Sequence, residues 1–419
     1  MTKLLGLLRH PVVAVVAAVT AFALALRQVS TAPIVDLDVF RAGGEAWLAG
    51  RGLFDAEFPP RPLLFPLPFI YPPIAAVVFS GFTVLPLVTL GQVMTVVTVL
   101  ALVAACVVTA RRCGLDRAAA FGVGAVVSAV MVDAEPVRST IDLGQINVLL
   151  MALVVLDCLL TRTPWPRGLL IGIAAGIKLT PLAFLLFFAF SGRWRIVLTA
   201  VSTFAGTVLL GFLLDAQNSL QYWTSTVFKL DTMVGAGFAT NQSLRAVLAR
   251  FGMDKAASFP FWLAGVAVVL TATWFVVRRL LADSAATPER AGVVAVQAMV
   301  VIATATLLCS PISWSNHWVW VAVAGAGLAA TLLRAPSWHL VVPALVVTVF
   351  FLGPHIHVPS NEGREEHWTL GQWFLGNAFV LTAVASFAAV VAVLAHRARA
   401  ANRARPAMGC EPARLSTVD

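Results

Sequence analysis

A series of apolar stretches of near-bilayer length, which carry almost no charge, restricts the folds that this chain can adopt. A membrane-spanning helix needs about 20 apolar residues. Inside a bilayer every backbone N–H and C=O must be paired internally, which favours helices. The sequence therefore predicts an all-α polytopic membrane protein with about 10–12 transmembrane helices. The stretches lie at roughly 11–29, 71–86, 91–110, 118–133, 145–160, 168–190, 196–214, 258–277, 293–309, 317–334, 338–353 and 374–395.

Composition supports the bilayer as the solvent for most of this chain. Of its 419 residues 59% are hydrophobic and 12% are charged, whereas soluble domains carry about 25% charged residues. The net charge of +9 comes from basic clusters beside apolar stretches, so we expect membrane lipids and no nucleic acid as partners. The five cysteines show no metal-ligand spacing, and we predict neither a metal nor a cofactor.

The basic residues also predict the topology. Both ends of the chain are basic, so both are expected in the cytoplasm, with an even number of crossings between them. This places residues 30–70, 215–257, 310–316 and 354–373 on the outer side of the cell membrane. We predict one transmembrane domain over residues 1–396, without internal repeats, and a disordered basic cytoplasmic tail over 397–419. An active site would face the periplasm or the cell exterior.

Two regions leave the number of crossings open. The stretch 71–110 contains Pro86 and is too long for one straight helix. The stretch 168–190 is interrupted by Lys178 and Pro181. Each region is compatible with two crossings, one kinked crossing or a re-entrant hairpin.

Two carboxylates, Asp36 and Asp38, stand where the first apolar stretch ends. A carboxylate near a low-dielectric boundary holds its proton more readily, which suits a general base acting on a sugar hydroxyl. The alternative is that these residues simply face water, and position alone favours that alternative. In an extended segment both side chains point to the same side, whereas in a helix they diverge.

Lys178 lies well inside an apolar stretch, where an ionisable residue is costly and indicates function. Its natural partner in a membrane enzyme is a phosphate, and the alternative is a side chain that extends to the membrane interface. His317 lies among tryptophans at an outer boundary, where it is able to contact a phosphate oxygen or move a proton. A lone interfacial histidine is otherwise ordinary, but it is expected on the same side as Asp36.

Further polar groups occur at predicted boundaries. Gln145 and Asn147 open one stretch, while Asn241 and Gln242 follow an outer loop. Such amides bind sugar hydroxyls or cap helices. Tyr71 precedes two prolines that force an extended backbone and then suit a helix start.

Taken together, these segments resemble the bacterial polyprenyl-phosphate-mannose-dependent α-(1,2)-mannosyltransferases of the GT-C superfamily, a family that includes the phosphatidylinositol-mannoside mannosyltransferase. Two positions depart from the family pattern: Phe40 stands where tyrosine is usual, and Asn316 where histidine is common. The second departure weakens any role that needs two histidines. The matching segments, in order, are Asp36-Leu37-Asp38-Val39-Phe40, Gly50 to Asp55, Phe69-Ile70-Tyr71-Pro72-Pro73, Leu143-Gly144-Gln145-Ile146-Asn147, Ile177-Lys178-Leu179-Thr180-Pro181, Asn241-Gln242-Ser243-Leu244-Arg245, Ser310-Pro311-Ile312-Ser313-Trp314 and Asn316-His317-Trp318.

The resemblance implies a GT-C-type enzyme that moves mannose from polyprenyl-phosphate-mannose to the 2-hydroxyl of a mannose on a lipid-linked acceptor. That acceptor would be a mannosylated glycolipid, either a phosphatidylinositol mannoside or lipomannan. Inversion at the anomeric carbon needs one displacement and one base. Together with the polar residues described above, the resemblance implies catalytic roles for Asp36 and His317. It implies that Lys178, Arg245 and His317 bind the donor phosphate. The residues implied to bind the acceptor or the sugar are Asp38, Tyr71, Gln145, Asn147, Asn241, Gln242 and Trp314.

Two other functions compete with this prediction. A transporter or flippase of a lipid-linked saccharide would spread polar residues along a path across the bilayer. Here they gather at the outer boundary, which favours the enzyme. A GT-C transferase of another sugar fits the sequence as well.

Overall fold

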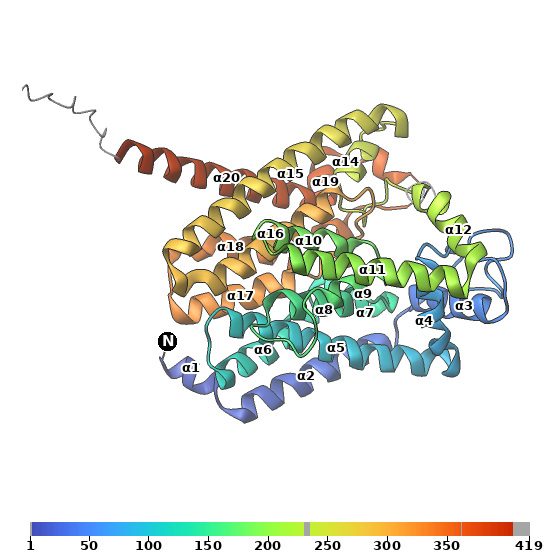
Figure 1. Ribbon diagram of the computed structural model, residues 1–419, viewed down its shortest axis with the longest axis horizontal. Helices are drawn as coiled ribbons and strands as arrows, with labels where there is room; N and C mark the ends of the chain where they lie inside the picture. The colour runs from blue at the N-terminus through green and yellow to red at the C-terminus, as the bar shows by residue number, and fades with distance from the viewer. Residues whose placement is uncertain (1, 230–234, 362, 405–419) are drawn as a thin grey trace, which may run out of the picture.

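The computed structural model describes residues 2–229, 235–361 and 363–404. Within these ranges the chain is built from α-helices and short 3-10 helices, and its β pairing is one isolated bridge between Asn241 and Trp314. Figure 1 shows most of the longer helices running roughly along one axis, so that the molecule is a bundle with two ends. The predicted all-α architecture is confirmed.

Six of the described helices are long and apolar enough to cross a bilayer. They keep large apolar side chains on the outside of the bundle, such as Leu198, Leu209 and Leu213 of one helix. In water that surface would be strongly unfavourable, so lipid is its solvent. The chain is therefore a multi-pass membrane protein. The six helices are α2 (Pro11–Val29), α5 (Leu87–Arg112), α11 (Trp194–Leu214), α15 (Lys255–Ala286), α16 (Ala291–Cys309) and α20 (Ala378–Ala404).

Shorter apolar segments complete the bundle. The pair α6 (Arg117–Met131) and α7 (Glu135–Leu143) bends by 71° at the break between its members and counts as a seventh candidate span. The expected total of about 10–12 spans is reached only if segments of 10–17 residues cross as well. Those segments are Pro73–Val84, Asn147–Leu159, Thr180–Ala189, Val321–Arg334 and Trp338–Leu352.

The region 71–110 contains one long helix preceded by a short one. α4 (Pro73–Phe79) and η1 (Ser80–Val84) end before Pro86, and α5 begins after it. Both short helices pack on α3 (Val35–Leu48), and a Cβ added to Gly44 of α3 would lie 2.5 Å from the carbonyl oxygen of Phe79. Gly91, near the start of α5, lies against Ile34, at the same end of the bundle. This region therefore runs the length of the bundle once, in α5.

The region 168–190 forms a hairpin that enters and leaves the bundle at the same end. α8 (Asn147–Leu159) approaches that end, where the Asp157 carboxylate accepts a hydrogen bond from the Gly168 N–H at 2.9 Å. α9 (Leu169–Ile177) then runs inward and breaks at Lys178, and η2 (Thr180–Phe184) and α10 (Leu185–Ala189) return. Arg167 before the hairpin and Arg193 after it line one pocket. Of the three alternatives, the structure has the re-entrant hairpin.

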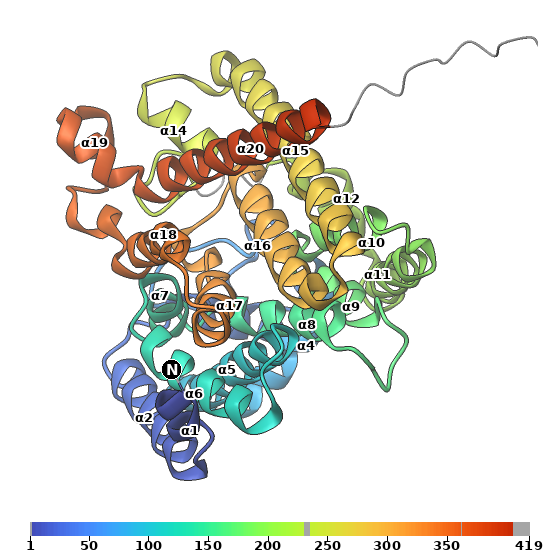
Figure 2. The same ribbon diagram turned by 90° about the vertical axis from the view of Figure 1, so that its left-hand side faces the viewer.

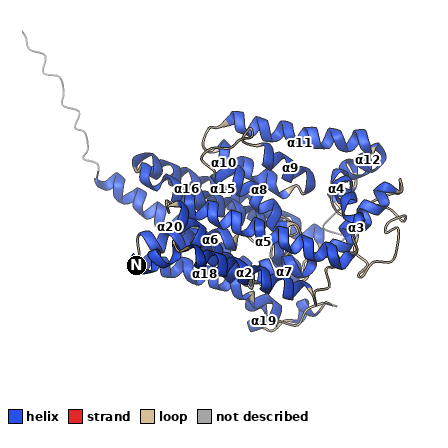
Figure 3. Cartoon of the chain, turned by 90° about the horizontal axis from the view of Figure 1, so that it is seen from below, coloured by secondary structure: helices blue, strands red, loops and turns tan. Residues whose placement is uncertain are grey.

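The two ends of the bundle differ in chemistry. One end, on the right in Figure 1, carries α3, α4 and α12 (Ala216–Thr224), and we call it the site end. The other, on the left, carries α1 (Thr2–Leu8) and the C-terminal turns of α20, and we call it the basic end. Figure 2 looks onto the basic end, and Figure 3 shows α3, α4 and α12 together at the site end. At the basic end Arg9 pairs with Asp116 at 2.7 Å, and Arg334 donates to the Cys113 carbonyl at 2.7 Å.

The hydrophobic core lies between α5, α8, α16 and α17 (Val321–Arg334), where Leu102, Met151, Met299 and Ala322 are fully or almost fully buried. α20 continues to Ala404, so residues 397–404 of the predicted tail are helical, while 405–419 lie outside the described residues. The domain boundary at 396 stays a prediction. The remaining helical elements are η3 (Thr226–Phe228), α14 (Leu244–Arg250), η4 (Pro288–Arg290), η5 (Ser315–His317), α17 (Val321–Arg334), η6 (Trp338–Leu340), α18 (Val341–Leu352), η7 (Pro354–His357), η8 (Arg364–His367) and α19 (Leu370–Gly376).

Candidate active site

Asp36 lies in the first turn of α3, just after the chain leaves α2. The Ile34 N–H donates to the Asp142 carbonyl at 2.8 Å and so ties this turn to the end of α7. Gln145 donates to Oδ2 of Asp36 at 2.8 Å. Burial raises the pKa of the Asp36 carboxyl, while the Gln145 hydrogen bond and the Lys178 charge oppose that rise. The side chain keeps partial exposure, and a carboxylate of this kind is suited to accept a proton.

Asp38 serves a different purpose, because the segment is helical and the two carboxylates diverge. Asp38 is 1% exposed. Its Oδ1 accepts from Arg61 at 2.7 Å and its Oδ2 accepts from the Leu64 N–H at 2.9 Å. Arg61 also donates to Glu45 at 2.7 Å. Both oxygens of Asp38 are therefore occupied in holding the loop that follows α3.

Gln145 links Asp36 to Tyr71. Gly144 ends α7 in the left-handed conformation, at φ 70°, and its close approach to Leu37 brings Gln145 to Asp36. The Gln145 amide also donates to the Tyr71 hydroxyl oxygen at 3.3 Å. Burial first, and then the Asp36 charge, raise the pKa of the Tyr71 phenol, which therefore stays neutral.

Lys178 stands at the tip of the hairpin and reaches this group from the other side. Its ammonium donates to Oδ1 of Asn147 at 2.9 Å and lies 2.9 Å from Nε2 of His317. It also lies 5.8 Å from the centre of the Tyr71 ring. An ammonium has three N–H groups, so one remains for a ligand after the contacts with Asn147 and His317. Lys178 points into the site and not toward a membrane interface.

His317 completes the group from the turn between α16 and α17. Burial, together with the Lys178 charge, lowers the pKa of the imidazole well below its usual range, so the ring is neutral. A neutral ring that accepts from Lys178 at Nε2 carries its proton on Nδ1. Within the described residues the buried Nδ1 has no hydrogen-bond partner. Asn147 fixes the backbone of this turn by donating to the Asn316 carbonyl at 3.0 Å.

A stripe of glycines explains how the hairpin can hold Lys178 in place. Gly168, Gly172 and Gly176 recur at four-residue spacing and face α11. A Cβ on Gly172 would lie 2.5 Å from Cβ of Thr203, and one on Gly176 would lie 2.5 Å from Oγ1 of Thr207. Small residues at this spacing let two membrane helices approach closely. The glycines of α9 thereby fix the position of Lys178 along α11.

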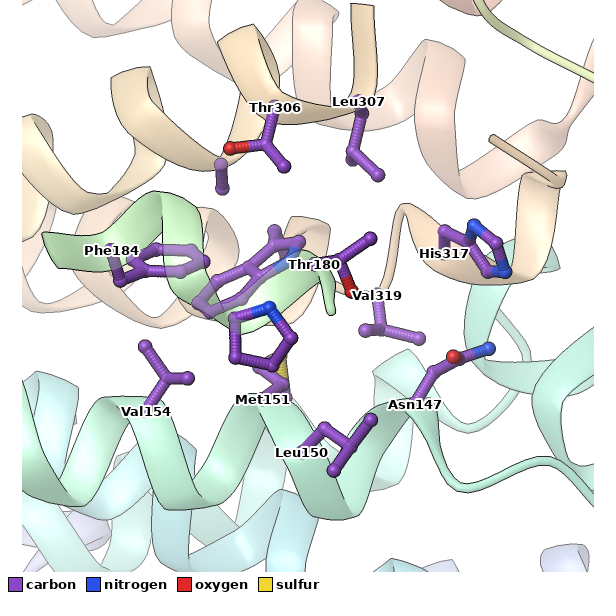
Figure 4. Close-up of a pocket in the computed structure, with 13 residues that line it drawn as sticks. Asn147, Leu150, Met151, Val154, Thr180, Phe184, Thr306, Leu307, His317 and Val319 are labelled. Carbon is purple, nitrogen blue, oxygen red and sulfur yellow. The ribbon is translucent and has the colours of Figure 1, made fainter. Parts of the chain in front are cut away.

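A small pocket with a cavity volume of about 40 Å³ lies beside His317 and Asn147. Figure 4 shows these two side chains at one end of the pocket and Phe184 and Val154 at the other. The lining is polar at the end with His317 and Asn147 and largely apolar toward Phe184 and Val154, which suits a phosphate joined to an apolar chain. Its lining comes from α8, η2, α16 and the turn before α17: Asn147, Leu150, Met151, Val154, Thr180, Pro181, Phe184, Ala303, Thr306, Leu307, His317, Val319 and Trp320.

Asn241 and Gln242 lie in a different set of contacts. Asn241 accepts from the Ser313 N–H at 2.9 Å, and Gln242 donates to the carbonyls of Ala239 and Gly376, each at 2.7 Å. Both side chains are fully buried. These bonds anchor the segment that leads to His317, so the two amides position the site in this structure.

The other two predicted residues also lie outside the cluster. Trp314 forms the bridge with Asn241, and its ring centre is 6.3 Å from that of Phe238. The Arg245 guanidinium lies 5.7 Å from the centre of the Trp262 ring. The structure thus brings together one group of predicted residues, which consists of Asp36, Tyr71, Gln145, Asn147, Lys178 and His317.

Several residues that support this cluster carry little signal in the sequence. Thr140 donates to the Asn316 carbonyl at 3.1 Å, and Ser315 donates to the buried Glu135 at 2.7 Å. Asn316 contributes its backbone carbonyl and also its side-chain Oδ1, which accepts from Asn147 at 3.2 Å. A buried acidic residue such as Glu135 at a helix break was the one available signal. Within the described ranges, no group of three His, Cys, Asp or Glu side chains is placed to hold a metal ion.

Comparisons with known proteins place this chain among glycosyltransferases. Glycosyltransferase family 87 matches residues 69–311. A polyprenol-phosphate-mannose-dependent alpha-(1-2)-phosphatidylinositol mannoside mannosyltransferase from Mycolicibacterium smegmatis is 36% identical over 378 residues, covering 86% of this chain and 83% of that protein. The protein of the same name from Mycobacterium tuberculosis is 38% identical over 301 residues, covering 68% of each. A pentamannoside mannosyltransferase from Mycolicibacterium smegmatis is 33% identical over 290 residues, covering 69% of this chain and 68% of that protein.

No solved structure matches this chain. The family match contains Tyr71, Gln145, Asn147 and Lys178, four members of the cluster, and it spans more than half of the chain. Because relatives above 30% identity are also covered over more than two thirds of their length, this chain belongs to glycosyltransferase family 87.

Proposed function

We propose that this chain transfers mannose from polyprenyl-phosphate-mannose to the 2-hydroxyl of a mannose on a phosphatidylinositol mannoside, with inversion. The names of the relatives supply the donor and the acceptor. The observation that carries the proposal is the juxtaposition of Asp36 and Lys178. A partly exposed carboxylate and a partly exposed ammonium share one cluster beside a pocket whose polar end is formed by His317 and Asn147.

Asp36 is the general base. Gln145 holds Oδ2, which leaves Oδ1 for the acceptor hydroxyl. Oδ1 takes the proton as the hydroxyl oxygen attacks the anomeric carbon of the donor. The bond between that carbon and the phosphate oxygen breaks, and its electron pair leaves with the polyprenyl phosphate. One base is enough for this single displacement.

Lys178 stabilises the leaving phosphate. Its remaining N–H donates to a phosphate oxygen that gains negative charge in the transition state. His317 orients the ammonium through Nε2, and its Nδ1 has a proton to offer an oxygen in the adjacent pocket. The first isoprene units of the donor lie along the apolar wall between Val154 and Phe184.

The remaining predicted contacts keep narrower roles in the proposal. Arg245 is a second cation for the donor phosphate, and replacing it by Ala should raise the donor KM more than the acceptor KM. Asp38, Asn241, Gln242 and Trp314 stay predictions as acceptor contacts. An unchanged donor KM and kcat for Arg245→Ala removes that residue from the donor site.

The central experiment uses the purified full chain in mixed micelles with labelled polyprenyl-phosphate-mannose and phosphatidylinositol mannosides of increasing mannose number. Transfer should occur and the product should be sensitive to an α-(1,2)-specific mannosidase. Polyprenyl phosphates that carry glucose or arabinose are the matched alternative donors. Transfer of another sugar in preference to mannose contradicts the proposed donor, and movement of intact lipid across vesicles without transfer supports the transporter instead.

We further propose that the site end faces the periplasm and the basic end faces the cytoplasm of the cell membrane, because basic residues are retained on the inner side. Ala56 and Glu289 are exposed near opposite ends of the bundle. In a background where Cys309 and Cys410 are serine, Ala56→Cys should react with an impermeant thiol reagent in intact cells, whereas Glu289→Cys should react only after lysis. The reverse pattern rejects this orientation.

A further inference from the structure

A second pocket lies at the basic end, at the far ends of α8 and α9 from the candidate active site. Its volume is about 300 Å³, and it lies between the ends of α5, α8, α10, α15 and α16. In Figure 2, which looks onto this end, α15 and α16 run side by side. Neither the relatives' names nor the proposed transfer reaction gives this pocket a role.

Three arginines from separate segments line the pocket. Arg112 ends α5, Arg167 precedes α9, and Arg193 precedes α11. None of the described residues that line it is acidic. Within the described part of the chain Nε of Arg112 is buried without a hydrogen-bond acceptor, and the charges of Arg193 and Arg167 repel that of Arg112. Like charges gathered in a partly desolvated space are unfavourable until an anion joins them.

The remaining lining divides into hydroxyl groups and an apolar wall. Thr161 supplies a hydroxyl donor beside the arginines, and the hydroxyl groups of Ser191 and Ser284, which donate to the carbonyls of Phe187 and Leu281, add polar lining. Guanidinium and hydroxyl groups together are typical ligands of phosphate oxygens. The apolar wall comes mainly from α15 and α16, two candidate membrane spans, and consists of Val277, Leu281, Ala291, Val294, Ala295 and Ala298.

We propose that this pocket binds the phosphate group of an anionic phospholipid, with an acyl chain along the wall of α15 and α16. Basic pockets between membrane helices bind anionic lipid headgroups. The arginines would bind inorganic phosphate by the same chemistry, and the apolar wall favours the lipid. Arg167 and Ser191 flank the re-entrant hairpin. A lipid bound there stabilises the base of the hairpin whose tip carries Lys178.

The test compares two neighbouring arginines on the full-length protein in mixed micelles. Arg193 and Arg195 are both exposed, and only Arg193 lines the pocket. The probes are phosphatidylglycerol, phosphatidylcholine and inorganic phosphate, each titrated while the midpoint of thermal unfolding is recorded. Phosphatidylglycerol should stabilise the wild type and Arg195→Gln alike. Arg193→Gln should need at least about tenfold more lipid, because one charge-assisted contact is lost.

Arg112→Gln should behave as Arg193→Gln does, and since Arg193 is exposed, its variant keeps the test valid if the Arg112 variant misfolds. Equal responses of Arg193→Gln and Arg195→Gln to phosphatidylglycerol reject the pocket as the lipid site. Equal stabilisation by phosphatidylcholine rejects the requirement for an anionic lipid. Full stabilisation by inorganic phosphate alone assigns the pocket to a free phosphate and overturns the lipid.

Discussion

Replacing Asp36 by Asn removes a base while keeping its shape. The Asn oxygen can still accept the Gln145 hydrogen bond that Asp36 Oδ2 accepts at 2.8 Å, so the fold should be retained. Loss of a general base typically lowers a rate by about 10²- to 10⁴-fold, which corresponds to roughly 3–5 kcal/mol in activation free energy. The substitution also removes a negative charge near Lys178. The donor KM should therefore stay the same or fall while kcat collapses.

Asp38→Asn is the matched control, because it makes the same chemical change two residues away. Asp38 is buried and both of its oxygens are bonded. Losing the charge weakens a bond worth about 1.5–3 kcal/mol, although Arg61 keeps its contact with Glu45. The midpoint of thermal unfolding should fall, while kcat per folded molecule stays near that of the wild type.

The assay follows single-turnover transfer from labelled polyprenyl-phosphate-mannose, with mass spectrometry to exclude deamidation of Asn back to Asp. Formate added to Asp36→Ala should restore part of the rate by acting as an external base. The reasoning fails if Asp36→Asn keeps at least a tenth of the wild-type kcat. If instead Asp38→Asn abolishes transfer without loss of stability, the base is the other carboxylate.

Three further predictions concern the groups around Asp36. Because the ionised carboxylate is the active form and the Gln145 hydrogen bond lowers its pKa, Gln145→Leu should move the acid limb of the rate profile to higher pH; an unmoved limb contradicts this. Lys178→Met should lower kcat about 100-fold and weaken donor binding. The measurement is the dependence of the transfer rate on donor concentration, and a variant with normal donor use would exclude Lys178 from the site. Gly172→Leu should destabilise the protein and abolish transfer, since a Cβ at this position already meets α11. In the control Gly206→Leu, a Cβ meets no heavy atom within 4 Å, so stability and transfer should stay unchanged.

The residues that sequence alone could identify were those whose presence in an apolar setting is costly. Lys178 interrupts an apolar stretch, and Asp36 stands at the end of another. Both belong to the cluster. The roles of Asp36 and Asp38 could not be separated from the sequence, because the difference depends on Arg61, which lies 23 residues after Asp38 in the irregular segment that follows α3. Local pattern does not predict which loop residue returns to pair with a carboxylate.

The path of the hairpin could not be predicted from the sequence for a related reason. The stretch 168–190 has the composition of a membrane span. Its path is decided by the contact of Gly172 with α11 and by the Asp157 carboxylate, which accepts from the Gly168 N–H at the base of the hairpin. Both contacts join segments that are separated in the chain, so the pattern within the stretch does not reveal them.

The buried amides show the same limit. Asn147 and Asn241 carry identical side chains at predicted boundaries. Asn147 lies at the start of α8 and meets the Lys178 ammonium, whereas Asn241 is enclosed by backbone groups of the segment before His317. Residue type does not separate the two environments, because each is created by a segment distant in the chain.

The hairpin also has a consequence for how the protein is made. Lys178 contacts Asn147, which is synthesised before it, and His317, which is synthesised 139 residues later. A nascent chain must therefore insert α11, α15 and α16 while the ammonium at the hairpin tip still lacks its imidazole neighbour. Chains grow from the N-terminus at about 5–20 residues per second, so this interval lasts on the order of ten seconds. Fragments that stop before residue 317 would be anchored in the membrane with an incomplete polar cluster, which makes them natural substrates for membrane quality control.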